Sequence, residues 1–498
     1  MKTLYELARL SHRQNRAFDL LIPPTDESPL RRLYSLVMTD SNLDDSACMQ
    51  EIYGKKSTAT FSRLKSRLKE IFLQALMIQN NSTDPEQARF EEIMSAYKST
   101  VVSRILNNKR AFSLTNDLLE KSITKSMKYH LTENVLAQAR LLVIYNSTIS
   151  LNKYKITKYL DIQTKYLNIY NWEIKSENYF LDLQKTQLQS LASAGNEAIK
   201  KAYKYHKDLE SAGDIKSFNF NYNKYRILAA YYEFTKNYNL LLELSEDAIK
   251  DFSSPEFKSE AVLSNINIRR LWSLIQSGQF VSAYSLGGKL LSKAQVGSNA
   301  WYRVAHYTLK AYIYNGDYSQ SIDLLKQIIE NPKYNKSSEY YKELFNTSLG
   351  YLYLLTDSGL IKDSLNLKEK IPEFKLGRYL NAVPVFSKDK RGINVSILLM
   401  HIAFLLLRKD HDAIIDRVDS LNQYVYRYLR RDDSFRSNCI IKMVIQITRA
   451  DFNKIRAERY TKELRKQLSE VPLIGSGENI EIEVIPFEEL WEIMYNSL

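Results

Sequence analysis

Glycine and proline are scarce in this sequence: its 498 residues include 14 glycines and 10 prolines, together about 4.8% of the chain. Average proteins contain roughly 12% of the two residues combined. Because β-sandwiches, barrels and propellers use both residues in their many turns, the shortage argues against these classes. The content of 44% hydrophobic and 26% charged residues is that of a globular rather than a disordered chain. The composition therefore predicts a protein of many helices.

Cysteines and long apolar runs are also rare. Cys48 and Cys439 lie near opposite ends of the chain, so they do not indicate a disulfide framework. The longest apolar run, residues 395–407, contains His401 and is shorter than the roughly 18 residues of a membrane span. The first 16 residues carry charges and lack the apolar region of a signal peptide. We therefore expect a soluble, cytoplasmic protein without membrane association.

Motifs of catalysis and of cofactor binding are missing as well. Gly287-Gly288-Lys289 lacks the earlier glycine of a phosphate-binding loop, and residues 475–477 lack the third glycine of a dinucleotide fingerprint. The six histidines never occur at metal-ligand spacing, and neither cysteine has a neighbouring catalytic partner. We therefore expect no catalytic residue, no cofactor and no metal. An enzyme with a site assembled from scattered residues is the remote alternative.

The net charge of +13 is unevenly distributed. Residues 55–69 include six basic side chains and no acidic one, and residues 454–466 include six basic and two acidic ones. After Lys466 the chain has seven glutamates and no basic residue. This asymmetry suggests a contact within the chain or a partner of opposite sign, and the alternative is a solvated surface with uneven charge.

The N-terminal 80 residues predict a small module of three helices. Pro29, with Ser28 as N-cap, begins the first, residues 44–53 form the second before Gly54, and the third extends from about 58 to 78. Two short helices and a longer basic one resemble a helix-turn-helix module. The resemblance implies that the third helix enters the major groove and that basic side chains contact phosphates. The candidate nucleic-acid-binding residues are Lys55, Lys56, Arg63, Lys65, Arg67 and Lys69.

A pair of helices joined by a short polar turn recurs along residues 88–468. The pattern is clearest over 222–332, where the turns occupy residues 235–238, 277–280 and 315–318. A weaker unit turns at residues 408–411. Since one helix pair cannot bury its apolar stripe alone, neighbouring pairs must stack into a superhelix.

The third of these units, with Tyr312, Gly316, Asp317, Tyr318 and a proline at 332, resembles the tetratricopeptide repeat (TPR), a helix pair of 34 residues. The spacing between its units here is longer than that consensus. The resemblance implies an all-α superhelix whose first helices line a concave peptide-binding groove. We expect most of the 35 tyrosines to fill the gaps between helices.

The positions that would face such a groove carry amides, cations and one indole. Amides bind a peptide backbone, cations bind carboxylates, and an indole covers an apolar side chain, so the set suits an extended acidic peptide. The alternative is that these side chains are merely solvated, and that the indole belongs to the core. The candidate groove residues are Asn223, Arg226, Asn265, Trp272, Arg303, His306 and Lys310.

The last segment, residues 469–498, is an acidic tail. Ile480, Ile482 and Val484 alternate with glutamates as in a strand, and an amphipathic helix follows Pro486. The tail docks either within the chain or on another protein.

We interpret the whole chain as a non-enzymatic protein-interaction scaffold with an acidic protein or peptide partner. The alternative is a nucleic-acid-binding regulator with a repeat array as sensor, and homo-oligomerisation stays open.

Overall fold

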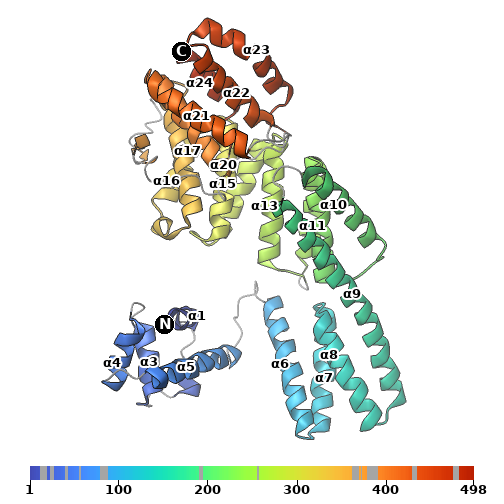
Figure 1. Cartoon of the computed structure of the whole chain (residues 1–498). Helices are drawn as coiled ribbons and strands as arrows, with labels where there is room; N and C mark the ends of the chain where they lie inside the picture. The colour runs from blue at the N-terminus through green and yellow to red at the C-terminus, as the bar shows by residue number, and fades with distance from the viewer. Residues whose placement is uncertain are drawn as a thin grey trace. The chain divides into compact units, whose positions relative to one another are not determined.

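The computed structural model confirms the expected all-α superhelical class (Figure 1). It describes residues 1–11, 19–22, 27–39, 43–54, 58–78, 88–189, 194–254, 257–361, 370–371, 373–377, 379, 391–428, 435–474 and 482–498. These residues contain helices and no strand. The chain divides into two units, Met1–Glu91 and Glu92–Leu498.

Unit 1 is a small helical domain with its own apolar core. Its helices are α1 (Lys2–Ser11), α3 (Pro29–Thr39), α4 (Asp45–Tyr53) and α5 (Thr58–Ile78). The predicted boundaries are confirmed, because the Arg31 amide donates to the Ser28 hydroxyl and Gly54 ends α4 with a φ of 65°. Phe61, Leu68 and Phe72 of α5 are buried against α1 and α3.

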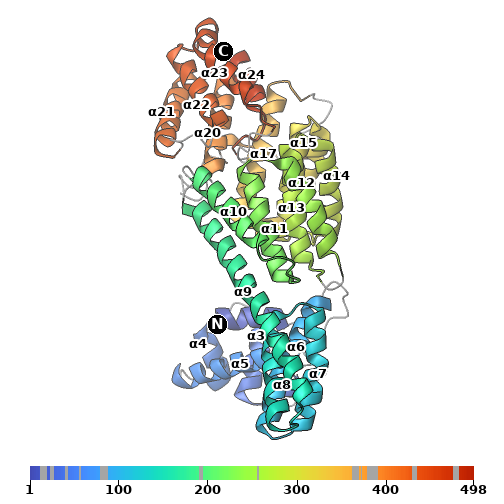
Figure 2. The same cartoon turned by 90° about the vertical axis from the view of Figure 1, so that its right-hand side faces the viewer.

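Unit 2 is a stack in which successive helices pack against their neighbours in the chain (Figures 1 and 2). Its helices are α6 (Ala88–Asn108), α7 (Phe112–Lys128), α8 (Thr132–Thr148), α9 (Lys153–Gln189), α10 (Ala194–Glu210), α11 (Phe218–Phe234), α12 (Tyr238–Phe252), α13 (Glu260–Gln276), α14 (Phe280–Lys293), α15 (Asn299–Tyr314), α16 (Tyr318–Ile329), η2 (Tyr334–Lys336), α17 (Glu339–Asp357), α20 (Arg391–Leu407), α21 (His411–Tyr428), α22 (Phe435–Arg449), α23 (Lys454–Glu470) and α24 (Phe487–Asn496).

One three-residue turn between consecutive helices recurs six times among the described residues of this unit. In each case the middle residue is left-handed, with φ between 53° and 75°, and the next amide donates to the carbonyl five residues earlier. This bond satisfies a carbonyl that the end of the helix leaves unpaired. The middle residues are Arg110, His130, Lys236, Gly278, Gly316 and Lys409. The turns predicted at 235–238, 277–280, 315–318 and 408–411 are confirmed, and those at Arg110 and His130 extend the pattern to α6–α8.

The acidic tail packs within the chain rather than standing free. The Arg436 side chain of α22 is fully buried and donates to both carboxylate oxygens of Glu483, at 3.0 and 2.6 Å, and to Glu488. Residues 482–486 form turns and bends around this cation, in place of the expected strand, and Ile480 lies outside the described residues. Glu483 also accepts from the Phe487 amide at the start of α24.

The basic helix α23 contacts the same tail. Arg465 pairs with Glu492 at 2.9 Å, and the Tyr495 hydroxyl donates to Glu458. The apolar side of α24, with Trp491 1% exposed, completes a core that continues from α15 to α24. The contact between segments of opposite charge therefore forms inside the molecule.

Candidate functional site: a groove between α14 and α16

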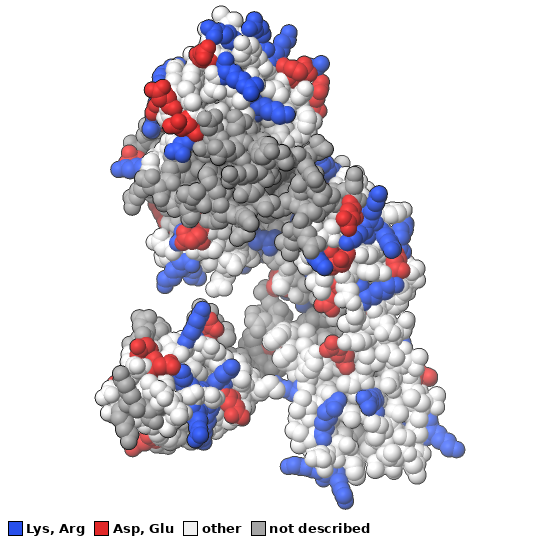
Figure 3. All heavy atoms as spheres, in the orientation of Figure 1, with Lys and Arg blue, Asp and Glu red and all other residues white. Residues whose placement is uncertain are grey.

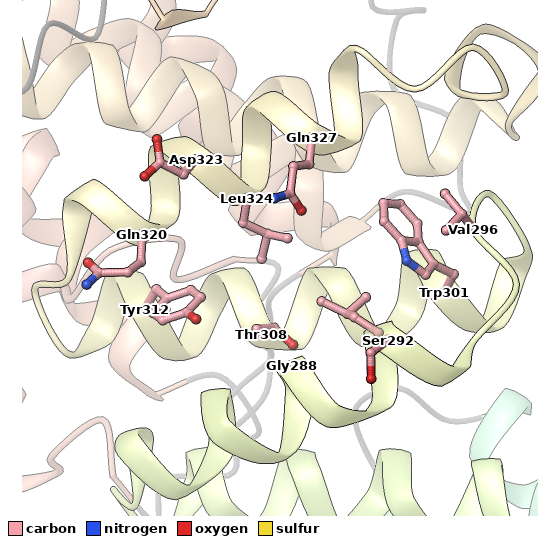
Figure 4. Close-up of a pocket in the computed structure, with 11 residues that line it drawn as sticks. Gly288, Ser292, Val296, Trp301, Thr308, Tyr312, Gln320, Asp323, Leu324 and Gln327 are labelled. Carbon is pink, nitrogen blue, oxygen red and sulfur yellow. The ribbon is translucent and has the colours of Figure 1, made fainter.

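A hollow of about 520 Å³ lies over α15, with α14 on one side and α16 on the other (Figure 4). This volume falls within the range of roughly 300–1,000 Å³ typical of ligand sites. The lining residues are Gly288, Leu291, Ser292, Val296, Trp301, Thr308, Tyr312, Gln320, Asp323, Leu324 and Gln327.

Two adjacent glycines of α14 shape this groove. A Cβ at Gly287 would lie 2.0 Å from the Thr308 hydroxyl oxygen, so glycine is what lets α14 approach α15 closely. A Cβ at Gly288 would meet nothing within 4 Å, because this position faces the hollow. Gly287 therefore lets α14 pack closely against α15, and Gly288 leaves the hollow beside it open.

The groove has an apolar floor and a polar rim. Trp301 and Leu324 are 5% and 7% exposed, whereas Gln320 is exposed at the rim. Gln320 and Gln327 lie seven residues apart on α16 and are therefore about 10 Å apart along its axis. Asp323, between them, accepts a hydrogen bond from Lys370 at 3.2 Å.

The lining supplies binding groups rather than a reacting centre. Asp323 is the one charged side chain among the described lining residues, and none of them is cationic. The Ser292 hydroxyl donates to the Lys289 carbonyl at 2.9 Å, so it faces its own helix. Tyr312 stacks on Tyr284 with 4.6 Å between ring centroids, and burial raises its pKa.

The groove predicted from the sequence lies on the other side of α15. At 100° per residue, Trp301, Thr308 and Tyr312 fall within about 40° of one another around the helix. Arg303, His306 and Lys310 are centred roughly 170° away. The predicted set and the observed hollow therefore share a helix but not a surface.

On that opposite side, Arg303 is exposed but its two companions are buried. His306 is 5% exposed and Lys310 1%. Burial, with the Lys310 ammonium nearby, holds the pKa of His306 well below its usual range. Lys310 lies 5.9 Å from the ring centroid of Tyr314 on its own helix. These two side chains are covered, so they are not presented to a peptide.

The two predicted groove residues of α11 contact each other and α9. Asn223 is buried and donates to the Ser176 hydroxyl, and its side-chain oxygen accepts from Arg226 at 3.1 Å. The Arg226 guanidinium lies over the ring of Phe180. Their contacts join neighbouring helices and leave little of Asn223 for a ligand.

The two predicted groove residues of α13 differ in exposure. Asn265 is exposed, whereas Trp272 is half-buried and packs edge-on against Tyr238, with 5.1 Å between centroids. Trp272 thus belongs to an aromatic contact between α12 and α13, in line with a role of the indole in the core. Sequence periodicity alone missed the α14–α16 groove, although the Gly287-Gly288 pair within a helix was a signal of close packing.

The candidate nucleic-acid-binding residues of unit 1 also differ in exposure and contacts. Lys55 and Lys56 lie outside the described residues, and Arg63, Arg67 and Lys69 are exposed on α5. Lys65 instead forms an ion pair with Asp45, which also binds the N-terminal ammonium at 3.2 Å. This contact with Lys65 is the main cause that lowers the pKa of Asp45.

In the described part of the chain, no three histidine, cysteine or acidic side chains gather to hold a metal ion. Both cysteines are buried. None of the described helices combines the length and apolar character needed to span a bilayer. Comparisons with protein families, curated proteins and solved structures return no match for this sequence.

Proposed function

We propose that this protein is a non-enzymatic interaction scaffold that binds an extended peptide segment of a partner in the groove between α14 and α16. The observation that carries the proposal is the open hollow with an apolar floor and two amides at its rim. The resemblance of residues 222–332 to tetratricopeptide repeats, whose helix pairs commonly bind peptides, supports the same class of function.

The geometry suits a peptide backbone. An extended chain advances about 3.4 Å per residue, so the spacing between Gln320 and Gln327 matches about three residues. Amide side chains both donate and accept, and can therefore pair with backbone groups of any sequence. Apolar side chains of the peptide would cover Trp301 and Leu324.

The charge of the partner is best inferred from the lining. The described lining contains no cation, and Lys370 beside it is already paired with Asp323, so the groove favours carboxylates little. We therefore propose a neutral or weakly basic apolar peptide for this groove, rather than the acidic one expected from the opposite side of α15.

Gly288→Leu tests this proposal, because a Cβ at this position meets nothing within 4 Å and the leucine side chain would project into the hollow. Random dodecapeptides displayed on phage are selected on the wild-type chain, and their affinity is measured by biolayer interferometry. We expect selected peptides to bind Gly288→Leu at least tenfold more weakly. Ser282→Leu, which adds the same side chain at an exposed position elsewhere on α14, should leave binding unchanged. Peptides that bind all three chains equally, or no enriched peptide at all, would contradict the proposal.

A second candidate, nucleic-acid binding by unit 1, is favoured by the exposure of Arg63 and Arg67 on the outer side of α5. Figure 3 shows Lys and Arg side chains gathered on this unit. Anisotropy of a labelled DNA duplex over a salt series tests it, since phosphate contacts weaken steeply with salt. We expect Arg63→Glu with Arg67→Glu to abolish binding, and Arg459→Glu with Lys462→Glu on α23 to preserve it. Lys65 is unsuitable for this test because its substitution would break the pair with Asp45. Equal loss in both variants, or no binding at low salt, argues against this function.

A further inference from the structure

The helix α9, 37 residues long, carries an exposed apolar row with a period of seven. The row consists of Leu160, Leu167, Ile174 and Leu181, which are 44%, 51%, 39% and 51% exposed. In Figures 1 and 2, α9 extends as one continuous helix from the α6–α8 group to α10 and α11. We call this row, with the residues between its members, the α9 seam.

The seam is not the side by which α9 packs in its own chain. The buried side chains Ile169, Phe180 and Leu183 lie roughly 130–170° away around the helix. A surface helix normally turns its apolar residues inward, so a second apolar row outside is unusual. It extends about 31 Å from Leu160 to Leu181, the length of three heptads.

A spacing of seven residues selects the kind of partner. Apolar residues at every seventh position keep facing a second helix only when the two helices supercoil, as in a coiled coil. With the row at the d positions, the a positions hold Thr157, Thr164, Asn171 and Asn178, all exposed. A polar residue at an a position of the heptad weakens a coiled coil but fixes its register.

We propose that the α9 seams of two copies of this chain pair as an antiparallel coiled coil. In an antiparallel pair each a residue meets a d residue of the other helix. Aligned about residue 169, Thr164 faces Ile174 of the other copy and Asn171 faces Leu167. Every layer then joins one apolar side chain with one small polar side chain, so no asparagine faces another asparagine.

The flanking charges fit the antiparallel alignment. In this register Asp161 of one copy lies beside Lys175 of the other, and the two-fold axis repeats the pair. Asp161 is exposed, and the Lys175 side chain is 40% exposed beside Asp208, so it can bridge both carboxylates. A parallel pair would instead bring Glu177 against Asp182, which repel. Charge complementarity therefore selects a second, antiparallel copy.

Sedimentation velocity of the full chain over a range of concentrations tests the proposal. We expect the mass to rise from 58.1 kDa to twice this value in the micromolar range. Leu167→Glu with Ile174→Glu should remain at 58.1 kDa at every concentration. The control, Leu240→Glu with Ile415→Glu, changes two residues of similar exposure on α12 and α21 and should dimerise as the wild type does.

A charge exchange tests the orientation and replaces the first test if the glutamates disturb folding. Asp161→Lys places two cations together and should raise the dissociation constant at least tenfold, and adding Lys175→Glu should restore dimerisation. Circular dichroism confirms that each variant keeps its helices. A wild-type chain that stays monomeric, or a dimer that the seam variants leave intact, overturns the proposal. A dimer that Asp161→Lys leaves unchanged overturns the antiparallel alignment.

Discussion

Gly316 and Lys236 occupy the same position of the same turn, with φ of 75° and 59°. A residue with a Cβ is strained in this left-handed region by about 1–2 kcal/mol, whereas glycine is not. Lysine at 236 is therefore tolerated because the turn bond and the packing of α11 on α12 hold it there.

Opposite substitutions at these two turns should change stability in opposite directions. Gly316→Ala adds a Cβ that meets nothing within 4 Å, so it should cost about 1 kcal/mol through φ alone. Lys236→Gly should stabilise by about 0.5–1 kcal/mol, since relief of strain exceeds the added freedom of the unfolded chain. Differential scanning calorimetry should show a lower Tm for the first and a higher Tm for the second. Shifts of the same sign would show that φ does not govern these turns.

Glu483 makes the stability of the tail depend on pH. Burial outweighs the hydrogen bonds from Arg436 and raises the pKa of Glu483 to about 7, from 4.5. Between these values the folded chain binds more protons than the unfolded chain, so the contribution of this group to stability falls as pH rises from about 4.5 to 7.

Glu483→Gln removes this titration and keeps the shape of the side chain. The variant should therefore gain stability relative to the wild type as pH rises from 5 to 8, by roughly 3 kcal/mol in total. Chemical denaturation of both chains at several pH values measures the difference. A difference that is constant with pH would mean that Glu483 is already ionised throughout this range.

At the scale of elements, the sequence predicts helices and glycine turns well and helix faces poorly. The turns at Gly278 and Gly316 are visible as glycines, whereas those at Arg110 and His130 carry no glycine. On α6, Val101 and Ile105 are exposed, while Thr100 and Ser103 are buried. Here α6 contacts α8 through polar side chains, whereas periodicity assumes an apolar contact. The side of α6 that is buried is therefore not its apolar side. The same limit applies to His306 and Lys310, which the pattern predicts in a groove and which are buried.

The helix α24 is a structural part of the core, so its removal should do more than change a partner interaction. Phe487, Leu490 and Trp491 are at most 1% exposed and pack on α20 and α22. Trp491→Ala should cost about 3–5 kcal/mol. Hydrogen exchange should then accelerate in α20 and α22, whereas Ile455→Ala, at a position 80% exposed, should change it little. Unchanged protection in α20 and α22 would mean that the tail only rests on the surface.

At the scale of the whole molecule, unit 2 is held together differently along its length. Helices α15–α24 share one continuous apolar core, whereas α7–α9, α9–α11 and α11–α13 are joined through separate smaller clusters. A polar cluster centred on Gln138, which is fully buried, links α8 to α6 and α7 beside the apolar contact of α7 with α8. The Gln138 amide donates to Thr100 and Ser122, at 3.0 and 2.9 Å, and its oxygen accepts from Ser126. Because stacked repeats are stabilised by nearest neighbours, local stability should follow these differences.

Gln138→Ala tests this gradient. The substitution removes the bonds of Gln138 to three buried hydroxyls and should destabilise α6–α8 by about 2 kcal/mol. Hydrogen exchange should accelerate in α6–α8 and stay unchanged in α15–α24, because no shared core transmits the loss. Gln184→Ala, at an exposed position of α9, serves as the control and should leave both regions as they are. Loss of protection in α15–α24 as well would show that the stack unfolds as one cooperative body, and that its separate clusters do not limit the spread of local unfolding.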